Sequence, residues 1–94
     1  MIVSFKDKET EKVFRQIVST KLPIDIQKTA LRKLVELNRA EQLFDITCIP
    51  GNHAEKLKGD LQGKWSIRIN SQWRILFVVN NEGNFAEVEI VDYH

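Results

Sequence analysis

In the first half of the chain, hydrophobic residues recur every three or four positions, which is the spacing of one face of an α-helix. A short strand over residues 2–5 comes first. Asp7 or Thr10 can then cap a helix that runs to about Val18. The expected apolar face of this helix consists of Val13, Phe14, Ile17 and Val18.

A second helix begins at Pro23 or Asp25, after Leu22-Pro23 has interrupted the first. Its apolar stripe consists of Ile26, Ala30, Leu31, Leu34, Val35 and Leu37. Its outer, polar side consists of Lys28, Arg32, Lys33, Glu36 and Arg39. The short link predicts that the two helices form an antiparallel pair. A further short helical turn is expected over residues 40–45, and a loop over 50–52.

From Leu57 onward the hydrophobic period changes to two, which indicates β-strands. Strands are expected over residues 64–69, 73–79 and 84–91, with a turn over 80–83. The order is therefore β-α-α-β-β-β. This order predicts an α+β fold in which the helix pair packs on one face of a mainly antiparallel sheet. Residues 1–94 form a single domain, as expected for this length.

The burial pattern selects one register for the first hairpin. A three-residue loop over 70–72 places Ile67 opposite Ile75. A two-residue loop would instead place a charged side chain opposite an apolar one on both faces of the hairpin. The three-residue loop also sets Arg68 directly across from Arg74 on the open face. Like charges in such positions destabilise a sheet. Either water and Glu87 or Glu89 screen the two arginines, or an anion such as a phosphate sits between them.

The last strand alternates, with Ala86, Val88 and Ile90 on one face and Phe85, Glu87 and Glu89 on the other. It leads into Asp92-Tyr93-His94, where three consecutive side chains include plausible proton donors and acceptors. His94 is the strongest candidate, because an imidazole titrates near neutral pH. The alternative is a polar, frayed terminus.

The net charge of +1 gives no general preference for nucleic acids, but the charge is unevenly distributed. Residues 53–78 hold five basic and two acidic side chains (5 − 2 = +3), and residues 79–94 hold four acidic and no basic ones (0 − 4 = −4). The basic residues are Lys56, Lys58, Lys64, Arg68 and Arg74. A local positive patch and simple charge complementarity between strands both explain this distribution. Lys58 can add a third cation to the face that carries the two arginines.

Several classes of protein are excluded. No apolar run approaches the roughly 20 residues that span a bilayer, and the charged start is unlike a signal peptide. Cys48 is a single cysteine, so an internal disulfide is excluded and a reduced, cytoplasmic setting fits. Cys48, His53, Asp92 and His94 lack the local spacing of metal ligands, so neither a metal nor a cofactor is expected.

Four motifs in the second half of the chain, taken together, resemble the HigB toxins of the RelE-like superfamily, which belong to bacterial type II toxin–antitoxin systems. The motifs are Leu57-Lys58-Gly59-Asp60, the run from Gly63 to Asn70, Gln72-Trp73-Arg74-Ile75 and the terminal Asp92-Tyr93-His94. The opening residues 1–8 are also similar to the start of the family. The resemblance therefore covers the chain from end to end, and it implies a RelE-like fold.

The resemblance also implies an activity. Relatives are ribosome-dependent endoribonucleases that enter the A site of the 30S subunit and cut mRNA without a metal, through attack of the ribose 2′-hydroxyl on the adjacent phosphate. It implies a HigA-like helix-turn-helix antitoxin as partner, operator DNA bound only through the toxin–antitoxin complex, and no membrane partner.

Family roles carry over to matching positions of this sequence. Arg74, assisted by Lys58, would stabilise the phosphorane. His94 would act as general acid or base, Tyr93 would orient or stack on a base, and Asp92 would fix a neighbour. RNA-binding roles fall to Arg68, Lys64, Lys56 and His53, although Arg68 does not match every relative.

One difference from the family pattern and two alternative functions remain open. Some relatives have a functional histidine before the Leu-Lys-Gly-Asp motif, but the spacing from His53 to Lys58 differs from theirs. The superfamily also includes ParE-like toxins, which bind DNA gyrase and do not cut RNA. The Asp-Tyr-His ending and the paired arginines favour the nuclease. A plain RNA-binding module, or a member that has lost its activity, is a third reading.

Overall fold

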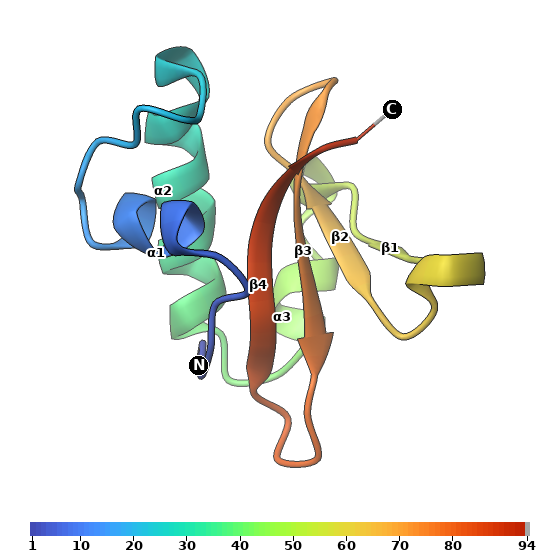
Figure 1. The fold of residues 1–94 in the computed structure, drawn as a ribbon. Helices are drawn as coiled ribbons and strands as arrows, with labels where there is room; N and C mark the ends of the chain where they lie inside the picture. The colour runs from blue at the N-terminus through green and yellow to red at the C-terminus, as the bar shows by residue number, and fades with distance from the viewer. Residues whose placement is uncertain (94) are drawn as a thin grey trace.

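A four-stranded antiparallel sheet carries the helices on one of its faces (Figure 1). The computed structural model describes residues 1–93. The strands are β1 (Glu55–Lys56), β2 (Trp65–Arg68), β3 (Trp73–Val79) and β4 (Phe85–Asp92), and they lie in chain order across the sheet. The three longer strands were predicted to within a residue or two of their bounds, whereas the two-residue β1 was not predicted. The observed fold confirms the predicted α+β class.

Helix α1 (Lys8–Phe14) begins as the sequence predicts. The carboxylate of Asp7 accepts a hydrogen bond from the backbone N–H of Thr10 at 2.7 Å, which satisfies one of the free donors of the first turn. The helix ends at Phe14, however, and the prediction that it runs to Val18 is wrong. Gln16 adopts a left-handed conformation (φ 64°), which turns the chain away from the helix axis.

Helix α2 (Ile24–Arg39) buries Ile26, Ala30, Leu34 and Leu37 of the predicted apolar stripe, while Leu31 and Val35 are half-buried. Lys33 was wrongly placed on its outer side. Lys33 is only 5% exposed, and its ammonium donates a hydrogen bond to the Asn52 side-chain oxygen. Asn52 is itself buried and donates to the Ile46 carbonyl at 3.0 Å. Burial lowers the pKa of Lys33, because desolvation penalises its charged form. The segment over residues 44–52 covers this side of α2 and supplies the polar partner that a buried ammonium requires.

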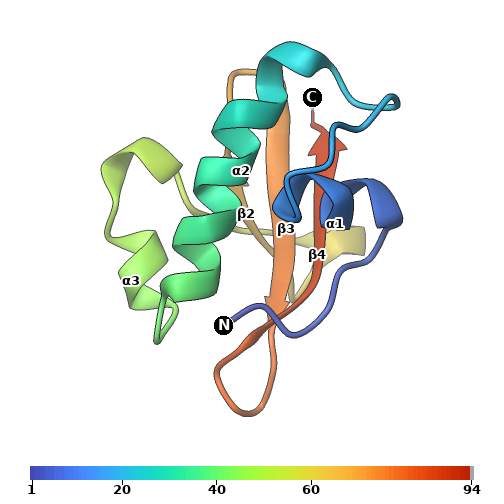
Figure 2. The same cartoon turned by 90° about the vertical axis from the view of Figure 1, so that its left-hand side faces the viewer.

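The two helices do not form the predicted antiparallel pair. Figures 1 and 2 show α1 lying across the axis of α2. Because α1 ends early, the link spans residues 15–23 and is long enough to redirect the chain. The short helix α3 (Phe44–Thr47) also begins later than the expected turn over 40–45. The residues before it are held by Asp45, which accepts hydrogen bonds from the backbone N–H groups of Glu41 and Gln42. None of the helices within residues 1–93 combines the length and the apolar character needed to cross a membrane.

The N-terminal segment pairs with β4 in parallel, through isolated bridges at Ile2 and Phe5. The Val3 N–H donates to the Phe85 carbonyl at 2.8 Å. The predicted strand over residues 2–5 therefore pairs with the sheet through these bridges, without forming a continuous strand. It adds a parallel edge to the sheet.

The predicted hairpin register is confirmed. Ile67 lies opposite Ile75, Trp65 opposite Phe77, and Arg68 opposite Arg74. The Ile69 N–H donates to the Trp73 carbonyl at 2.9 Å, which closes the loop over 70–72. The core between sheet and helices is completed by residues that include Val13, Ile26, Ala30, Leu34, Leu37, Ile67, Ile75, Phe77, Phe85, Val88 and Ile90.

A β-bulge in β4 overturns the predicted alternation of that strand. The register shifts between Leu76 and Val78, and Glu87 has a positive φ of 51°. The sequence placed Phe85 and Val88 on opposite faces, but the extra residue lets both enter the core, where both are fully buried. An edge-to-face contact with Phe77, at 5.3 Å between ring centroids, holds Phe85 there.

The sheet face away from the helices is less open than the sequence suggested. Ser66 and Leu76 on this face are buried, together with Leu57 from the segment after β1. The Leu57 N–H donates to the Lys64 carbonyl at 2.8 Å, which closes a loop that contains the 3₁₀ turn η2 (Gly59–Leu61). Figure 1 shows this loop on the side of the sheet opposite the helices. It makes one wall of the cleft beside Tyr93.

Candidate functional site

Arg74 occupies the centre of the candidate site, on the sheet face away from the helices. It is flanked in the sheet by Arg68 on β2 and by Val91 on β4. Its guanidinium carbon lies 5.7 Å from the centre of the Tyr93 ring, within the range of a cation–π contact. The Nη1 atom of Arg74 is buried and has no hydrogen-bond partner among the described residues. A buried donor without a partner is uncommon, and an anionic acceptor would satisfy it.

The carboxylate that could screen the arginines from close by is bound elsewhere. Glu89 pairs with Lys64 at 3.1 Å and with Lys6 at 3.5 Å. None of the ion pairs found within residues 1–93 includes Arg68 or Arg74. Glu89, one of the two carboxylates that the sequence offered as a screen, therefore does not fill this role. The pair of arginines remains available to an external anion.

A cleft of about 480 Å³ opens beside Tyr93. Its lining residues are Glu55, Lys56, Leu57, Lys58, Leu61 and Tyr93. Tyr93 belongs both to this cleft and to the contact with Arg74, so the cleft and the arginines adjoin. The structure thus brings Lys56, Lys58, Arg68, Arg74 and Tyr93 into one region, although β1 and β4 are far apart in the sequence.

Lys58 owes its position to the turn that follows it. It has an extended backbone (φ −126°) and leads into η2, where Gly59 has a positive φ of 69°. Glycine adopts this conformation without the steric cost that a side chain would bring. The neighbouring Leu57 anchors the segment by its burial, so the exposed Lys58 side chain starts from a fixed backbone.

Asp92 faces the hairpin loop and does not line the cleft. Its Oδ2 atom accepts a hydrogen bond from the Gln72 side chain at 3.0 Å. The next residue, Tyr93, donates its backbone N–H to the Gln72 carbonyl at 2.7 Å. These two contacts fix the end of β4 against the loop over 70–72, which sets the direction in which Tyr93 leaves the sheet. His94 lies outside the described residues.

Two residues expected to bind RNA are not among those that line the cleft. Lys64 is largely buried in its ion pair with Glu89 and links β4 to the loop that precedes β2. His53 is exposed and ends the 3₁₀ turn η1 (Pro50–Asn52) in a left-handed conformation, φ 42°. It lies two residues before β1, upstream of the cleft wall.

Glu55 is the residue that sequence reasoning missed. It lies opposite Ser66 in the sheet and contributes the single carboxylate that lines the cleft. A carboxylate can accept a proton, or accept hydrogen bonds from amino groups. The only sequence signal for a strand here was that Glu55 and Leu57 alternate with Lys56. A strand of two residues is too short to be recognised from a hydrophobic period of two.

The assembled site suits a phosphate-bearing, single-stranded ligand. Arginine presents a planar fork of donors that matches phosphate oxygens. An aromatic ring beside such cations offers a surface on which an unpaired base can stack. Among the residues that the structure describes, Tyr93 is placed to offer this surface, because its ring contacts the guanidinium of Arg74 and Tyr93 also lines the cleft.

Comparison with known proteins yields a consistent set of relatives. A family model described as the RelE-like toxin of the type II toxin–antitoxin system HigB matches residues 3–94. Toxin HigB-1 of Vibrio cholerae is 38% identical over 78 residues, which is 82% of each chain. Endoribonuclease HigB of Proteus vulgaris is 32% identical over 104 aligned positions that cover both chains completely. Among solved structures, the YoeB dimer from Staphylococcus aureus is similar, with 26% identity and a TM-score of 0.57, covering 99% of this chain and 94% of the other.

Proposed function

Because this chain belongs to the HigB-like family of RelE-like toxins of type II toxin–antitoxin systems, we propose that it is a ribosome-dependent mRNA endoribonuclease neutralised by a HigA-like antitoxin. The relative from Proteus vulgaris that carries the name endoribonuclease supports the reaction class. The observation that carries the proposal is the half-buried Arg74, whose Nη1 lacks a partner within residues 1–93 and whose guanidinium lies over Tyr93.

In the proposed reaction the 2′-hydroxyl of a ribose attacks the adjacent phosphorus. The bond from phosphorus to the 5′-oxygen breaks, so the products are a 2′,3′-cyclic phosphate and a free 5′-hydroxyl. One proton leaves the 2′-hydroxyl and one reaches the departing 5′-oxygen. Negative charge accumulates on the equatorial oxygens of the phosphorane, and Arg74 would stabilise that charge most strongly at this stage.

The other site residues have supporting roles in this proposal. Arg68 and Lys58 hold the backbone phosphates on either side of Arg74, with Lys56 adding charge at the far wall of the cleft. Tyr93 stacks on a base next to the cut. Asp92 fixes Tyr93 indirectly, through the hairpin loop. His94 exchanges a proton with one of the two ribose oxygens, and Lys64 and His53 contact RNA outside the cleft.

The proposed partners follow from the same family. The toxin acts in the cytoplasm on mRNA in the A site of the 30S subunit, without a metal or cofactor. The antitoxin is a helix-turn-helix protein, and the complex of the two binds operator DNA.

The test is induction of the chain without its antitoxin, followed by primer extension on cellular transcripts. We expect growth arrest and discrete, codon-associated cuts. Arg74→Ala is expected to lower the cleavage rate by about 10²–10³, the usual loss when a preorganised donor to developing charge is removed. Arg39→Ala is a matched control, because Arg39 is an exposed arginine on α2, in the helical layer, and should leave cleavage unchanged.

Other results would contradict the proposal. Growth arrest and cleavage that survive both Arg74→Ala and deletion of His94 would show that the site is wrongly assigned. Intact transcripts accompanied by DNA damage would instead indicate a ParE-like toxin that binds gyrase. Binding of mRNA without cleavage on translating ribosomes would indicate a plain RNA-binding module.

A further inference from the structure

The helical layer carries an apolar groove that the proposed reaction does not use. The groove lies between the end of α1, the link that follows it and α2, and has a volume of about 240 Å³. Val13, Ile17, Val18 and Leu31 supply its apolar lining. Ile17 and Val18 are 53% and 65% exposed, which is high for large apolar side chains on a structured segment. We call this feature the α1–α2 groove.

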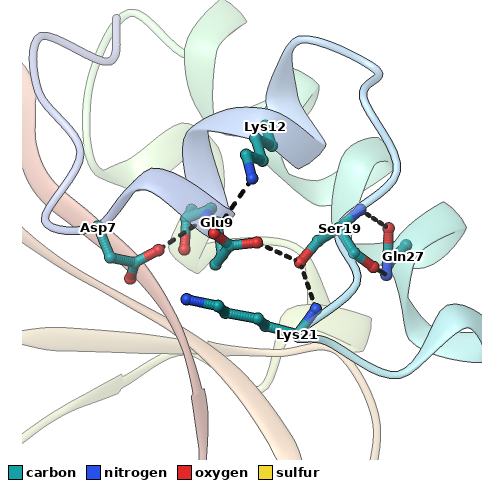
Figure 3. Close-up of polar contacts among 7 residues, drawn as sticks. Asp7, Glu9, Lys12, Ser19, Lys21 and Gln27 are labelled. Carbon is teal, nitrogen blue, oxygen red and sulfur yellow. Dashed lines mark hydrogen bonds and ion pairs between the residues drawn. The ribbon is translucent and has the colours of Figure 1, made fainter.

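Ile17 and Val18 are exposed on a link that is held firmly in place. Ser19, the next residue, is fully buried. Its N–H donates to the Gln27 side-chain oxygen at 3.0 Å, and the Gln27 amide donates back to the Ser19 carbonyl at 2.9 Å. Figure 3 shows this reciprocal pair together with the bond from the Ser19 hydroxyl to Glu9, at 2.6 Å. The link is thereby tied to both helices, in a position that leaves the two apolar side chains exposed.

The surroundings of the groove are basic. Residues 9–36, which include the glutamates that pair with Arg15 and Arg32, hold six basic side chains and four acidic ones (6 − 4 = +2). Arg15 and Arg32 are paired with glutamates of their own helices. Lys21 and Lys28 take part in none of the ion pairs found within residues 1–93, and Lys28 lines the groove. A partner that carries acidic residues beside apolar ones would complement both features.

The size of the groove indicates the form of that partner. Small-molecule pockets usually have about 300–1,000 Å³, so this groove is smaller and better suited to a few side chains of another chain. An amphipathic helix presents apolar side chains every three or four residues along such a groove, with charged residues on its flanks.

We propose that the α1–α2 groove is the docking surface for an acidic, amphipathic helix of the cognate antitoxin. The choice of partner rests on the proposed function. Figure 1 shows the helices and the loop of the cleft on opposite faces of the sheet, so variants in the groove leave Arg74 and Tyr93 untouched.

The experiment uses the full chain and the full-length antitoxin encoded with it, purified separately, with affinity measured by calorimetry. Both toxin forms carry Arg74→Ala so that their expression is tolerated. Val18→Glu should weaken binding by roughly tenfold or more, because it places a carboxylate in an apolar contact beside an acidic helix. Phe44→Glu on α3 is the matched control, since Phe44 is 66% exposed and lies outside the groove. It should change the affinity by less than about twofold.

A second variant tests the charge. Lys28→Gln should weaken binding and reduce its dependence on salt, because one screened attraction is lost. Unchanged melting temperatures show that the variants fold. Binding of Val18→Glu within about twofold of the unsubstituted chain would overturn the inference. A dimer of this chain that Val18→Glu dissociates, with antitoxin affinity unchanged, would assign the groove to a second copy and overturn it as well.

The two proposals fail separately. Without Arg74→Ala, the Val18→Glu chain should still arrest growth and cut mRNA, and coexpressed antitoxin should no longer rescue growth fully. If the unsubstituted chain cuts no RNA, the proposed function fails while the measured affinities still decide the docking surface.

Discussion

At the scale of single residues, Arg68 and Arg74 are two like charges for which none of the ion pairs within residues 1–93 supplies a counter-charge. The sheet register holds them directly opposite each other. Glu89, which could have balanced them, is bound to Lys64 and Lys6. Two like charges held opposite each other strain the sheet electrostatically, and the phosphate of the proposed RNA substrate would relieve that strain. If the proposed function is correct, the protein gives up some stability here for activity, which is a common trade in proteins.

This strain is testable with Arg68→Gln. Removing one of two like charges across a strand pair should raise the free energy of unfolding by about 0.5 kcal/mol at low ionic strength. The gain should shrink in high salt, because screening already weakens the repulsion. Urea unfolding at two salt concentrations measures both effects, and RNA cleavage should fall in the same variant. A loss of stability would instead show that Arg68 makes a stabilising contact.

Lys33 illustrates why sequence reasoning misplaced a charged residue. Its position on the helix is next to the apolar stripe, and lysines are almost always solvated. Only the chain segment 44–52, which follows α2 in the sequence and folds back over it, supplies Asn52 as a partner. A distant segment therefore decided its burial, and the period of the helix carried no information about it.

At the scale of elements, the bulge in β4 shapes the sheet. Glu87 is a non-glycine residue in the left-handed region, and its N–H donates to the Ser4 hydroxyl at 2.9 Å. The bulge allows Phe85 and Val88 to face the core together, and the N-terminal segment pairs along the bulged strand. A glycine often marks a bulge, and the strand has none at this point. The regular alternation of its apolar and polar residues therefore predicted a strand without a bulge.

Substitutions at Glu87 test this interpretation. Glycine occupies positive φ without steric cost, so Glu87→Gly should be neutral or stabilise the protein by up to about 1 kcal/mol. Glu87→Val should destabilise it, because a β-branched side chain is least tolerated there. Chemical denaturation of the pair measures the difference. If valine and glycine give equal stability, Glu87 does not hold the left-handed conformation in solution.

At the scale of the whole molecule, hydrogen bonds centred on Ser19 and Glu9 tie α1, the link and α2 into one layer (Figure 3). The bond from the Ser19 hydroxyl, with a smaller contribution from Lys12, lowers the pKa of Glu9. The unfolded chain binds the proton more readily than the folded one, so folding is favoured at pH values above the ordinary value of 4.5. This stabilisation is lost as the pH falls through the lowered pKa of the folded state.

Melting temperatures between pH 7 and pH 3 test this dependence. We expect Glu9→Gln to melt lower than the parent at neutral pH and to lose less stability on acidification, because its amide does not titrate. Glu82→Gln, in the exposed turn between β3 and β4, serves as the control and should follow the parent curve. Parallel curves for Glu9→Gln and the parent would contradict the assigned role of Glu9.

The features that depend on short periods and local capping could be predicted from the amino-acid order alone. The α+β class, the three long strands and the arginine pair across the hairpin follow from the spacing of neighbouring residues, and Asp7 is one of the two helix caps that the sequence left open. Other features depend on which distant segment covers a given face, and these could be seen only in the folded chain. They are the burial of Lys33, the turn of Phe85 into the core, and the meeting of Lys58 with Tyr93 in one cleft. The reason is physical. Periodicity fixes the direction in which a side chain points, whereas its solvation is set by residues far away in the chain.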